Sequence, residues 1–486
     1  MNLLALLHTV PVRDQHGPRE VEVKDFHFDS RVGGEGDMCV AVKGTMVDGH
    51  DFIDKAIQQG AKVIVAEQAP TKEIDGISWI EVENTAQALG HIAGNFYGNP
   101  AAKIQVIGIT GTNGKTSVAT MLHGMFNNFG LHAGLVSTVE NMVGNTAYPA
   151  THTTPNPKQL HKLFAEMLEN GCSHCFMEVS SHGLDQQRTA GIQFAGAVFT
   201  NITHDHLDYH GTFAEYIKAK KMLFDQLHPS AFALVNTDDK NGRVMVQNTR
   251  AKVKTFAMRR LADFHARLLE NTFEGLLLDI NGKEVWCRML GAFNAYNLLA
   301  AFGVARELGI DEEETLRGLS RLAGVAGRFE PVRNLAGPVA VVDYAHTPDA
   351  LKNVMTTLRD ILQGAGQLFV VTGCGGNRDT TKRPIMGQIA SDLADRAVFT
   401  SDNPRDEAPE AIINEMWDGV PAAQRRKVLR VNDRREAIRL ALNLAQPQDV
   451  VLVAGKGHES YQEINGVRHP FDDREVIRDL FKETIS

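Results

Sequence analysis

Ile104–Ser117 reads IQVIGITGTNGKTS, in which a strand, a glycine-rich turn and the start of a helix follow one another directly. The apolar run Ile104–Ile109 is typical of a buried parallel strand, and a helix is expected over Ser117–Phe129. Elements in this order surround a phosphate with backbone N–H groups, and the helix N-terminus adds its dipole. The stretch therefore predicts an α/β fold built around a nucleotide phosphate site.

The residues of the turn supply the chemistry that such a site needs. Lys115 brings a full positive charge, and Thr116 brings the hydroxyl expected on the magnesium ion of a nucleotide. The usual P-loop spacing requires glycine at position 109, where this chain has Ile109. A glycine-rich turn that binds nothing is the alternative, but the order of strand, turn, lysine and helix favours phosphate binding. The expected contacts are Gly111, Thr112, Asn113, Gly114, Lys115, Thr116 and Ser117.

Length and composition are those of a multidomain globular protein. The 486 residues suggest about three domains, and 43% of them are hydrophobic and 22% charged. No apolar run approaches the ~18–20 residues that span a bilayer, and the apolar start MNLLALLHTV lacks the basic region of a signal peptide. The net charge of −9 argues against a nucleic-acid surface. We expect small-molecule substrates, no nucleic acid, no membrane insertion and a monomer.

The cysteines indicate a reducing environment. There are five, an odd number, and they are scattered along the chain, which predicts a cytoplasmic location without structural disulfides. Cys172 and Cys175 have CxxC spacing, but no second pair accompanies them. Buried thiols are therefore favoured over a metal site at this pair.

Alternating strands and helices predict three α/β segments, at 1–98, 99–330 and 331–486. The first is small, with strands at Met38–Val42, Lys62–Ala66 and Ile77–Val82 and helices at His50–Gln59 and Thr85–Tyr97. The second alternates like a doubly wound parallel sheet, with further strands at Gly134–Ser137, Cys175–Val179, Ala195–Thr200 and Ala231–Val235. The third repeats this rhythm, with strands at Val339–Val342, Leu368–Thr372, Ala397–Thr400 and Val450–Val453.

Polar residues follow the predicted strands of the second segment. Ligands bind at the carboxyl ends of parallel strands, so this placement matters more than any single motif. Carboxylates with imidazoles near a nucleotide site suit magnesium or manganese, and plain surface histidines are the alternative. The residues concerned are Glu178, His204, Asp205, His206 and Asp208.

Two further patterns each allow more than one interpretation when only the residues are considered. Asp402–Arg405 reads Asp-Asn-Pro-Arg, which places a carboxylate near a guanidinium and suits a zwitterion such as an amino acid. A plain Asn-Pro turn would have the same sequence. Lys220 lies with Lys218 and Lys221 on a predicted charged helix, where a solvated face is the ordinary interpretation.

Five motifs, in order along the chain, resemble the Mur ligase family of peptidoglycan synthesis. They are GTNGKT at Gly111–Thr116, MEVSSHGL at Met177–Leu184, HDHLDYHG at His204–Gly211, DYAHTP at Asp343–Pro348 and GKGHE at Gly455–Glu459. The resemblance runs over all three segments. It implies an N-terminal domain that holds a UDP end, a central ATPase domain and a C-terminal Rossmann-like domain that brings an amino acid. The implied cofactors are ATP and Mg²⁺.

The reaction implied by the resemblance is ATP-dependent amide formation at the D-glutamate of a UDP-muramoyl dipeptide, through an acyl phosphate. Asp402–Arg405 favours meso-diaminopimelate as the incoming amino acid, because its second carboxylate can pair with Arg405; L-lysine, which lacks that carboxylate, is the alternative. A ligase like folylpolyglutamate synthetase lacks the paired Asp-Asn-Pro-Arg and Gly-Lys-Gly-His-Glu loops. The other alternative is a P-loop NTPase switch, in which hydrolysis drives a change of shape and no bond is formed between substrates. It leaves those two loops without a function.

The resemblance also implies roles for single residues. Catalysis is assigned to Lys115, His206 and Lys220, with Lys220 carbamylated. Metal ligands are Thr116, Glu178, His206 and Lys220, and Asn297 and Asp343 join the nucleotide site. The UDP-muramoyl dipeptide is assigned to Phe28, Ser30, Thr153, Thr154, Ser180, Gln186 and Arg188. Diaminopimelate is assigned to Arg378, Asp402, Asn403, Pro404, Arg405, Gly455 and Glu459.

Overall fold

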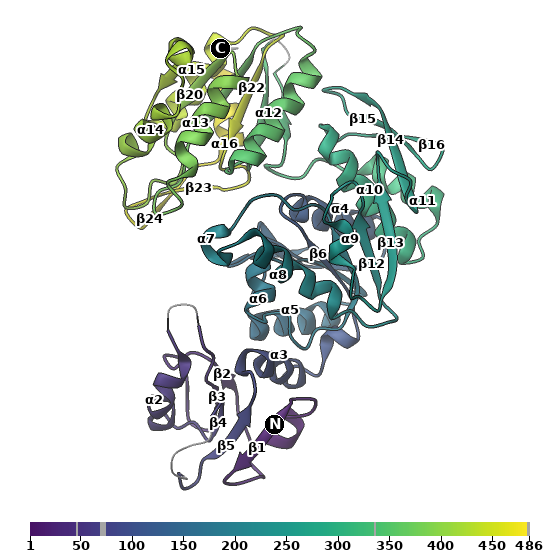
Figure 1. The fold of residues 1–486 in the computed structure, drawn as a ribbon, viewed down its shortest axis with the longest axis vertical. Coiled ribbons are helices and arrows are strands. Elements are labelled where there is room, and N and C mark those ends of the chain that lie inside the picture. The colour runs from purple at the N-terminus through teal and green to yellow at the C-terminus, as the bar shows by residue number, and fades with distance from the viewer. Residues whose placement is uncertain (45–46, 69–73, 335–336, 484–486) are drawn as a thin grey trace.

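The computed structural model describes residues 1–44, 47–68, 74–334 and 337–483. Its strands form three large sheets, placed one after another along the long axis of the molecule, and one separate hairpin (Figure 1). Each large sheet has helices packed on it, which confirms the predicted α/β class. None of the helices in the described part of the chain is long and apolar enough to cross a membrane.

The N-terminal sheet has five strands in the order β1-β5-β4-β3-β2, and only β1 is antiparallel to its neighbour. The strands are β1 (Val12–His16), β2 (Phe26–His27), β3 (Met38–Val40), β4 (Val63–Ala66) and β5 (Ser78–Val82). The helices are α1 (Leu3–Leu6), η1 (Gly49–Phe52), α2 (Ile53–Gln58) and α3 (Thr85–Phe96). The helix expected at His50–Gln59 is therefore divided, since its first turn is a 3₁₀-helix.

The central sheet has eleven strands in the order β16-β15-β14-β13-β12-β11-β6-β10-β7-β8-β9. The parallel strands at its centre are β6 (Gln105–Thr110), β7 (Ala133–Val136), β10 (His174–Glu178), β11 (Phe194–Phe199), β12 (Phe232–Asn236) and β13 (Lys252–Ala257). The edge strands are β8 (Glu140–Val143), β9 (Thr146–Pro149), β14 (Phe264–Asn271), β15 (Leu276–Ile280) and β16 (Lys283–Cys287). The expected central strands are confirmed, whereas β13 and the edge strands were not predicted.

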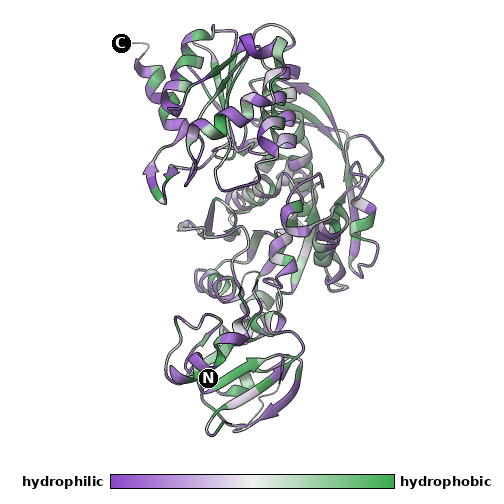
Figure 2. Cartoon of the chain, turned by 60° about the vertical axis from the view of Figure 1, so that its left-hand side comes forward, coloured by the Kyte–Doolittle hydropathy of each residue, from purple (hydrophilic) through white to green (hydrophobic). Residues whose placement is uncertain are grey.

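Helices cover both faces of the central sheet. The described helices of this part are η2 (Pro100–Ala102), α4 (Lys115–Asn128), α5 (Pro157–Glu169), α6 (Ser181–Asp185), α7 (Leu207–His210), α8 (Phe213–Asp225), α9 (Gly242–Met245), α10 (Ala292–Glu307) and α11 (Glu312–Arg321). Apolar residues of α4 and α10 pack with Ile107 and Ile109 of β6, whereas α5 and α8 pack with Val106, which points to the other face. Figure 2 shows hydrophobic (green) segments in strands and hydrophilic (purple) segments on outer helices and loops. β6 is thus held rigidly at the centre.

The C-terminal sheet has six strands in the order β17-β18-β22-β19-β20-β21. They are β17 (Glu330–Val332), β18 (Val339–Asp343), β19 (Leu368–Thr372), β20 (Arg396–Phe399), β21 (Val428–Arg430) and β22 (Val450–Ala454). Its helices are α12 (Pro348–Leu362), α13 (Lys382–Leu393), α14 (Pro409–Asp418), η3 (Ala422–Lys427), α15 (Arg434–Leu444) and α16 (Asp473–Glu483). β23 (Tyr461–Ile464) and β24 (Val467–Pro470) form the separate hairpin.

His161 makes the packing of α5 against α3 sensitive to pH. It is 1% exposed, and a Cβ on Gly94 of α3 would lie 3.3 Å from its Cε1. Burial, aided by nearby His91, lowers the pKa of His161 to about 4. The unfolded chain, in which a histidine has a pKa of about 6.5, therefore binds a proton that the folded chain does not, and stability is lost as the pH falls from about 6.5 to about 4.

We expect His161→Gln to remove part of this pH dependence. At about pH 5 the lost contribution is on the order of 2 kcal/mol, so the melting temperature of the wild type should fall more steeply between about pH 7 and pH 5 than that of the variant. Scanning calorimetry of both proteins measures it, with His132→Gln at an exposed histidine as control. Equal slopes for wild type and H161Q would show that another group is responsible.

Candidate active site

The loop Gly111–Gly114 connects the end of β6 to α4, and its glycines are sterically required. Gly111 has φ +150° and Gly114 has φ +90°. A Cβ on Gly111 would lie 2.0 Å from Thr200 Oγ1, and one on Gly114 would lie 2.5 Å from Asn297 Oδ1. The predicted strand, turn and helix are present, although α4 begins at Lys115, two residues before the expected start.

Residues after β11 hold this loop from below. Thr200 Oγ1 donates to Asn113 O at 2.6 Å, and Asn201 Nδ2 donates to the same carbonyl at 3.0 Å. Thr112 N donates to the carbonyl of Asn201 at 2.8 Å. Because three bonds fix the loop to a central strand, its backbone N–H groups are oriented before any ligand binds.

The half-buried Lys115 and the buried Lys220 share one carbonyl of the loop. Lys115 Nζ donates to Gly111 O at 2.9 Å and to Thr112 O at 2.8 Å, and Lys220 Nζ donates to Gly111 O at 2.8 Å. Lys220 is 1% exposed, whereas Lys218 and Lys221 pair with carboxylates of their own helix. Burial, followed by the charge of Lys115, lowers the pKa of Lys220 well below its ordinary value. Lys220 is thus the lysine of its helix that faces the loop, with its neutral, nucleophilic form favoured.

Glu178 ends β10 on the other side of the loop. Its side chain is 1% exposed and accepts hydrogen bonds from Thr138 N at 2.8 Å and Thr138 Oγ1 at 3.3 Å. His206 lines the same cavity with a side chain that is 43% exposed, and its partial desolvation there lowers the pKa of the imidazole. A carboxylate and a neutral imidazole beside a phosphate loop are donors that a divalent cation accepts.

The five-residue Asp/Glu/His cluster expected from the sequence is not one ligand group. His204 is exposed and stacks on Phe213 with ring centroids 4.8 Å apart, and Asp208 is exposed on α7. Neither lines the cavity, whereas Glu178, Asp205 and His206 do. Within residues 1–44, 47–68, 74–334 and 337–483, no three His, Cys, Asp or Glu side chains are placed to hold one ion. Closeness in sequence failed here because His204 stacks on Phe213 in the loop before α7, while Asp208 lies on an exposed position of α7.

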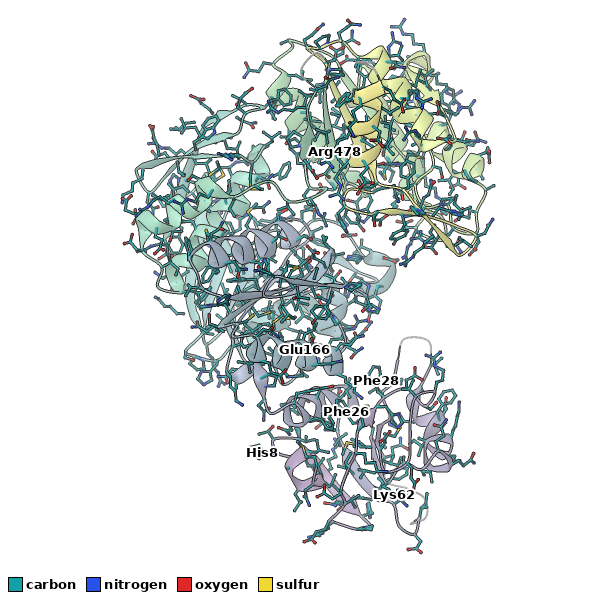
Figure 3. The ribbon with its side chains drawn as sticks, turned by 180° about the vertical axis from the view of Figure 1, so that it is seen from behind. His8, Phe26, Phe28, Lys62, Glu166 and Arg478 are labelled. Atoms are coloured by element: carbon teal, nitrogen blue, oxygen red, sulfur yellow. The ribbon has the colours of Figure 1, made fainter. Side chains whose placement is uncertain are left out.

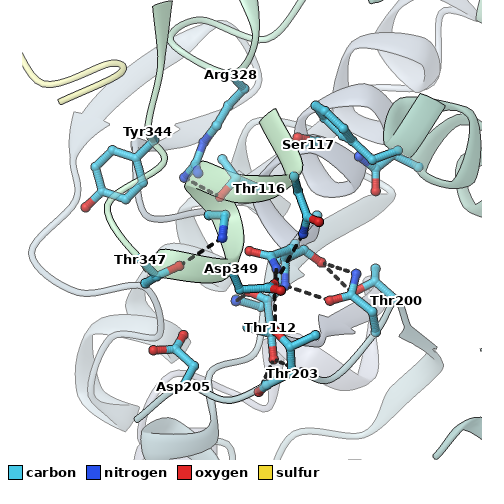
Figure 4. Close-up of a pocket in the computed structure, with 18 of the residues that line it drawn as sticks. Thr112, Thr116, Ser117, Thr200, Thr203, Asp205, Arg328, Tyr344, Thr347 and Asp349 are labelled. Atoms are coloured by element: carbon cyan, nitrogen blue, oxygen red, sulfur yellow. Dashed lines mark hydrogen bonds between the residues drawn. The ribbon is translucent and has the colours of Figure 1, made fainter. Parts of the chain in front are cut away.

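The cavity above the loop has a volume of about 480 Å³ and is closed by residues of the C-terminal part (Figure 4). This size suits a nucleotide. Asp343, at the end of β18, lies in its wall and accepts a hydrogen bond from Phe329 N at 2.7 Å, and burial raises its pKa to about 6. Asn297 of α10 also lines it and donates to Asn294 Oδ1 at 2.9 Å.

Among the residues of this cavity that were not predicted, Arg328 and Asp349 make hydrogen bonds to the loop or to the first turn of α4. Arg328 Nη2 donates to Thr116 Oγ1 at 3.1 Å, with its guanidinium 4.5 Å from the centre of the Tyr344 ring. Asp349, in the first turn of α12, accepts hydrogen bonds from Thr203 Oγ1 at 3.0 Å and Asn113 Nδ2 at 3.3 Å. Figure 4 shows both reaching the loop from the C-terminal side. Arg328 follows a glycine between segments and Asp349 follows Thr347-Pro348, but neither pattern indicates a partner more than a hundred residues away.

A second cavity, of about 1060 Å³, lies between the N-terminal and central parts. Four residues expected at the UDP-muramoyl dipeptide line it, namely Phe28, Ser30, Gln186 and Arg188. Figure 3 labels Phe28 at the edge of the N-terminal part that faces the central one. This wall is ordered, because the Arg188 guanidinium donates to Gln186 Oε1 at 2.7 Å and to Thr154 O at 2.7 Å.

The remaining residues of that group connect the two cavities. Thr153 and Ser180 line the cavity above the loop, not the second one. Thr154 is buried between them and donates to Ser180 Oγ at 3.2 Å and Glu178 O at 3.0 Å. Hydrogen bonds of the buried Thr154 with Arg188 and Ser180 therefore join the wall of the large cavity to the wall of the cavity above the loop.

Most of the residues expected at the amino acid meet at the carboxyl ends of β19, β20 and β22. Asn403 Nδ2 donates to Glu459 Oε2 at 2.8 Å, and Arg405 Nη1 donates to Gly376 O at 2.7 Å. Gly455 has φ +117°, and a Cβ there would lie 2.5 Å from Asp402 Oδ2. Pro404 O accepts from Glu407 N at 3.0 Å. Arg378 is exposed at the rim of the Gly373–Gly376 loop and makes no described hydrogen bond to this group.

Three family models match successive parts of the chain. They are "Mur ligase family, catalytic domain" at residues 25–97, "Mur ligase middle domain" at 109–305 and "Mur ligase, glutamate ligase domain" at 327–457. A relative from Phocaeicola vulgatus named UDP-N-acetylmuramoyl-L-alanyl-D-glutamate--2,6-diaminopimelate ligase is 51% identical over 99% of both chains. A relative of the same name from Chlorobaculum tepidum is 44% identical and covers 94% of this chain and 92% of its own.

Solved structures agree with the sequence comparison. A structure titled as UDP-N-acetylmuramoyl-L-alanyl-D-glutamate--2,6-diaminopimelate ligase superposes with a TM-score of 0.72 at 31% identity, covering 100% of this chain and 99% of that one. A folylpolyglutamate synthase from Mycobacterium tuberculosis superposes with a TM-score of 0.60 at 18% identity, covering 76% of this chain and 92% of its own. The second likeness shows a shared fold alone.

Proposed function

Since the chain belongs to the Mur ligase family, we propose that it joins meso-diaminopimelate to the D-glutamate of UDP-N-acetylmuramoyl-L-alanyl-D-glutamate, with ATP converted to ADP and phosphate. What supports this activity best is the pair of neighbouring cavities, whose walls are joined by hydrogen bonds of Thr154 with Arg188 and Ser180. A long substrate held in the larger cavity would place its carboxylate near the nucleotide in the smaller cavity. L-Lysine in place of diaminopimelate is the second candidate, and Arg405 favours the first.

Each segment takes one substrate in this proposal. Residues 1–98 hold the UDP end, residues 99–330 hold ATP, and residues 331–486 bring the amino acid. The net charge of −9 fits an enzyme of small molecules that does not bind nucleic acid. The five cysteines are free and buried, which fits a reducing compartment, so we place the enzyme in the cytoplasm as a monomer.

The nucleotide and its metal ion would be held by the residues of the smaller cavity. Gly111–Ser117 would bind the phosphates, with Lys115 neutralising their charge and Asn297 and Asp343 in the walls. The donor set of Thr116, Glu178, His206 and a modified Lys220 fits Mg²⁺, since it offers oxygens and one imidazole around one space. When bound, Mg²⁺ supplies positive charge against the phosphate oxygens. Arg328 adds a second fixed cation beside Thr116.

The residues serve a reaction in two chemical stages. The D-glutamate carboxylate attacks the γ-phosphorus, ADP leaves, and an acyl phosphate forms; a free carboxylate is a poor electrophile because it lacks such a leaving group. The amine of diaminopimelate then attacks the acyl carbon, and the tetrahedral intermediate expels phosphate to leave the amide. Lys115 and Arg328 lie where charge develops in the first stage, and their fixed positions avoid reorganisation.

Product formation tests the proposal directly. The protein is incubated with ATP, Mg²⁺, the UDP-muramoyl dipeptide and either meso-diaminopimelate or L-lysine, and the nucleotide-sugar products are separated by mass. We expect a tripeptide product with diaminopimelate. If a tripeptide formed with L-lysine but not with diaminopimelate, L-lysine would be the substrate. If ADP formed without any tripeptide, the protein would be an NTPase and not a ligase.

We propose that the Arg405 guanidinium binds the second carboxylate of diaminopimelate. Arg405→Ala should raise the KM for diaminopimelate by about 10- to 100-fold, because a charge-assisted bidentate contact is lost, and should leave the KM for ATP within about twofold. Steady-state kinetics with each substrate varied in turn measures this. Arg396→Ala, at an exposed arginine of the same sheet, is the matched control. An equal rise in both KM values would contradict the assignment.

A further inference from the structure

The hairpin β23–β24 holds the backbone of the loop Asp402–Arg405. Arg405 N donates to Glu463 O at 3.0 Å, and Asn465 N donates to Arg405 O at 2.8 Å. These bonds form an isolated parallel bridge between Arg405 and Ile464. Arg405 has φ +51°, a left-handed conformation that a residue with a side chain adopts only where its surroundings impose it. The hairpin thus fixes the backbone from which the Arg405 guanidinium projects.

Gln462 of β23 holds the first residue of the same loop. Its Nε2 donates to Asp402 O at 2.7 Å and to Ser401 Oγ at 3.3 Å. Next to it, Glu463 N donates to Asn403 Oδ1 at 2.9 Å. Each of the residues Asp402, Asn403 and Arg405 therefore has at least one direct hydrogen bond to the hairpin.

Lys456 completes the support from below. Its side chain is fully buried, and its Nζ donates to Asn403 Oδ1 at 3.1 Å and to Glu459 Oε2 at 3.0 Å. Asn403 Nδ2 donates to Glu459 Oε2 at 2.8 Å, which closes a triangle of the three side chains. With its oxygen occupied by Lys456 and by the hairpin, the Asn403 amide cannot flip, so its orientation is set.

The charge of Lys456 also acts on Glu459. Burial, followed by the nearby Asp402 carboxylate, raises the pKa of Glu459, and the Lys456 ammonium opposes that rise. Leaving an ammonium without water is costly unless its partners are well placed. The partners of the Lys456 ammonium are Asn403 and Glu459, which we propose to contact the amino acid. The buried charge therefore orients both side chains.

We propose that Lys456 and Gln462 are positioning residues for the incoming amino acid, which hold Asn403, Arg405 and Glu459 in the binding geometry without contacting the ligand themselves. This inference rests on the proposed function, because it takes these three side chains as the amino-acid site. It assigns the hairpin Tyr461–Pro470 a part in amino-acid selection.

The main test replaces Lys456 by methionine, which keeps the aliphatic volume and removes the ammonium. We expect the KM for meso-diaminopimelate to rise about 10- to 100-fold, because two charge-assisted bonds that orient the site are lost. The KM values for ATP and for the UDP-muramoyl dipeptide should stay within about twofold, since those sites lie on other elements. Lys482→Met is the matched control: Lys482 also pairs with a carboxylate three residues away, but on the surface of α16.

Gln462→Ala provides a second, milder variant that leaves the buried charges intact. Its KM for diaminopimelate should rise about 3- to 10-fold, as expected for one neutral hydrogen bond and its effect on the loop. If K456M is insoluble, this variant decides the question. An unchanged KM for diaminopimelate in soluble K456M, or in Q462A, would overturn the inference, as would an equal rise in all three KM values, which indicates a merely structural role.

The wild-type protein separates this inference from the proposed function. If the wild type forms no tripeptide with diaminopimelate, the proposed function fails. If the wild type forms it and neither variant changes the KM for diaminopimelate, only the positioning role fails. Tripeptide formation by the wild type, together with a KM shift confined to diaminopimelate in the variants, supports both.

Discussion

Lys115→Met lowers kcat/KM for the ligase reaction by about 10³-fold or more, because it removes a fixed cation from the phosphate loop. Lys115 Nζ is held by Gly111 O and Thr112 O, so its charge is in place before the nucleotide arrives. Methionine preserves the packed methylene groups, and the loss therefore reports the charge. Rates of ADP and tripeptide formation measure it.

The control for this prediction is a lysine of the same part of the chain that lies outside the loop. Lys103 is exposed, and Lys103→Met should retain wild-type rates. If K115M kept more than about a tenth of the wild-type activity, the loop would not be the site of phosphoryl transfer in the way we propose.

Removal of CO₂ from the wild-type enzyme and the substitution Lys220→Ala should each abolish most activity, by about 10²- to 10³-fold, and only the first loss should be reversed by bicarbonate. In the proposed modification the neutral Lys220 amine would attack CO₂, forming an N–C bond and releasing a proton, so that a carbamate with a negative charge would replace the amine beside the metal donors. That carboxylate would be an oxygen ligand for Mg²⁺, whereas a protonated Lys220 would repel the ion. The burial of Lys220 beside Lys115 provides the neutral amine.

The experiment dialyses the wild type against a mildly acidic CO₂-free buffer, in which a carbamate decomposes, and assays it with and without bicarbonate. Lys218→Ala, at the exposed lysine two residues earlier that pairs with Glu215, is the control and should behave like the wild type. Full activity of the dialysed protein without bicarbonate, or a bicarbonate response of K220A, would exclude the modification.

The strands and turns that the sequence predicted well are those in which one physical signal dominates. β6, β10, β11 and β22 are buried over most or all of their length, and each has an apolar stretch at its centre, which is typical of an inner parallel strand. The glycines of the phosphate loop are needed because any side chain would collide with Thr200 or Asn297. Such positions are specified locally, and they were predicted correctly.

The elements that were missed depend on tertiary context. β9 (Thr146–Pro149) is exposed along its whole length, and β14 alternates only partly, so neither has a strong period. Arg328 and Asp349 belong to turns whose function depends on the third sheet lying over the loop, which no local pattern encodes. His204 and Asp208 have the chemistry of metal ligands but are exposed and lie outside the cavity, because His204 stacks on Phe213 in the loop before α7 and Asp208 lies on the exposed side of α7.

The resemblance to a family supplied what local physics did not. Nothing in the charged helix around Lys220 distinguished it from Lys218 and Lys221, yet Lys220 is the buried lysine and the other two pair at the surface. The same holds for Asp402–Arg405, which reads as an ordinary Asn-Pro turn until Glu459 and the hairpin are seen beside it.

Phosphate release is the most direct test of the central claim, that this chain is a ligase for which the nucleotide, the dipeptide and the amino acid must all be bound. It is measured with ATP and Mg²⁺, adding the UDP-muramoyl dipeptide, meso-diaminopimelate, or both. The account predicts sustained release only when both are present, with one phosphate for each tripeptide formed. Sustained release without the dipeptide would contradict it and identify a nucleotide hydrolase.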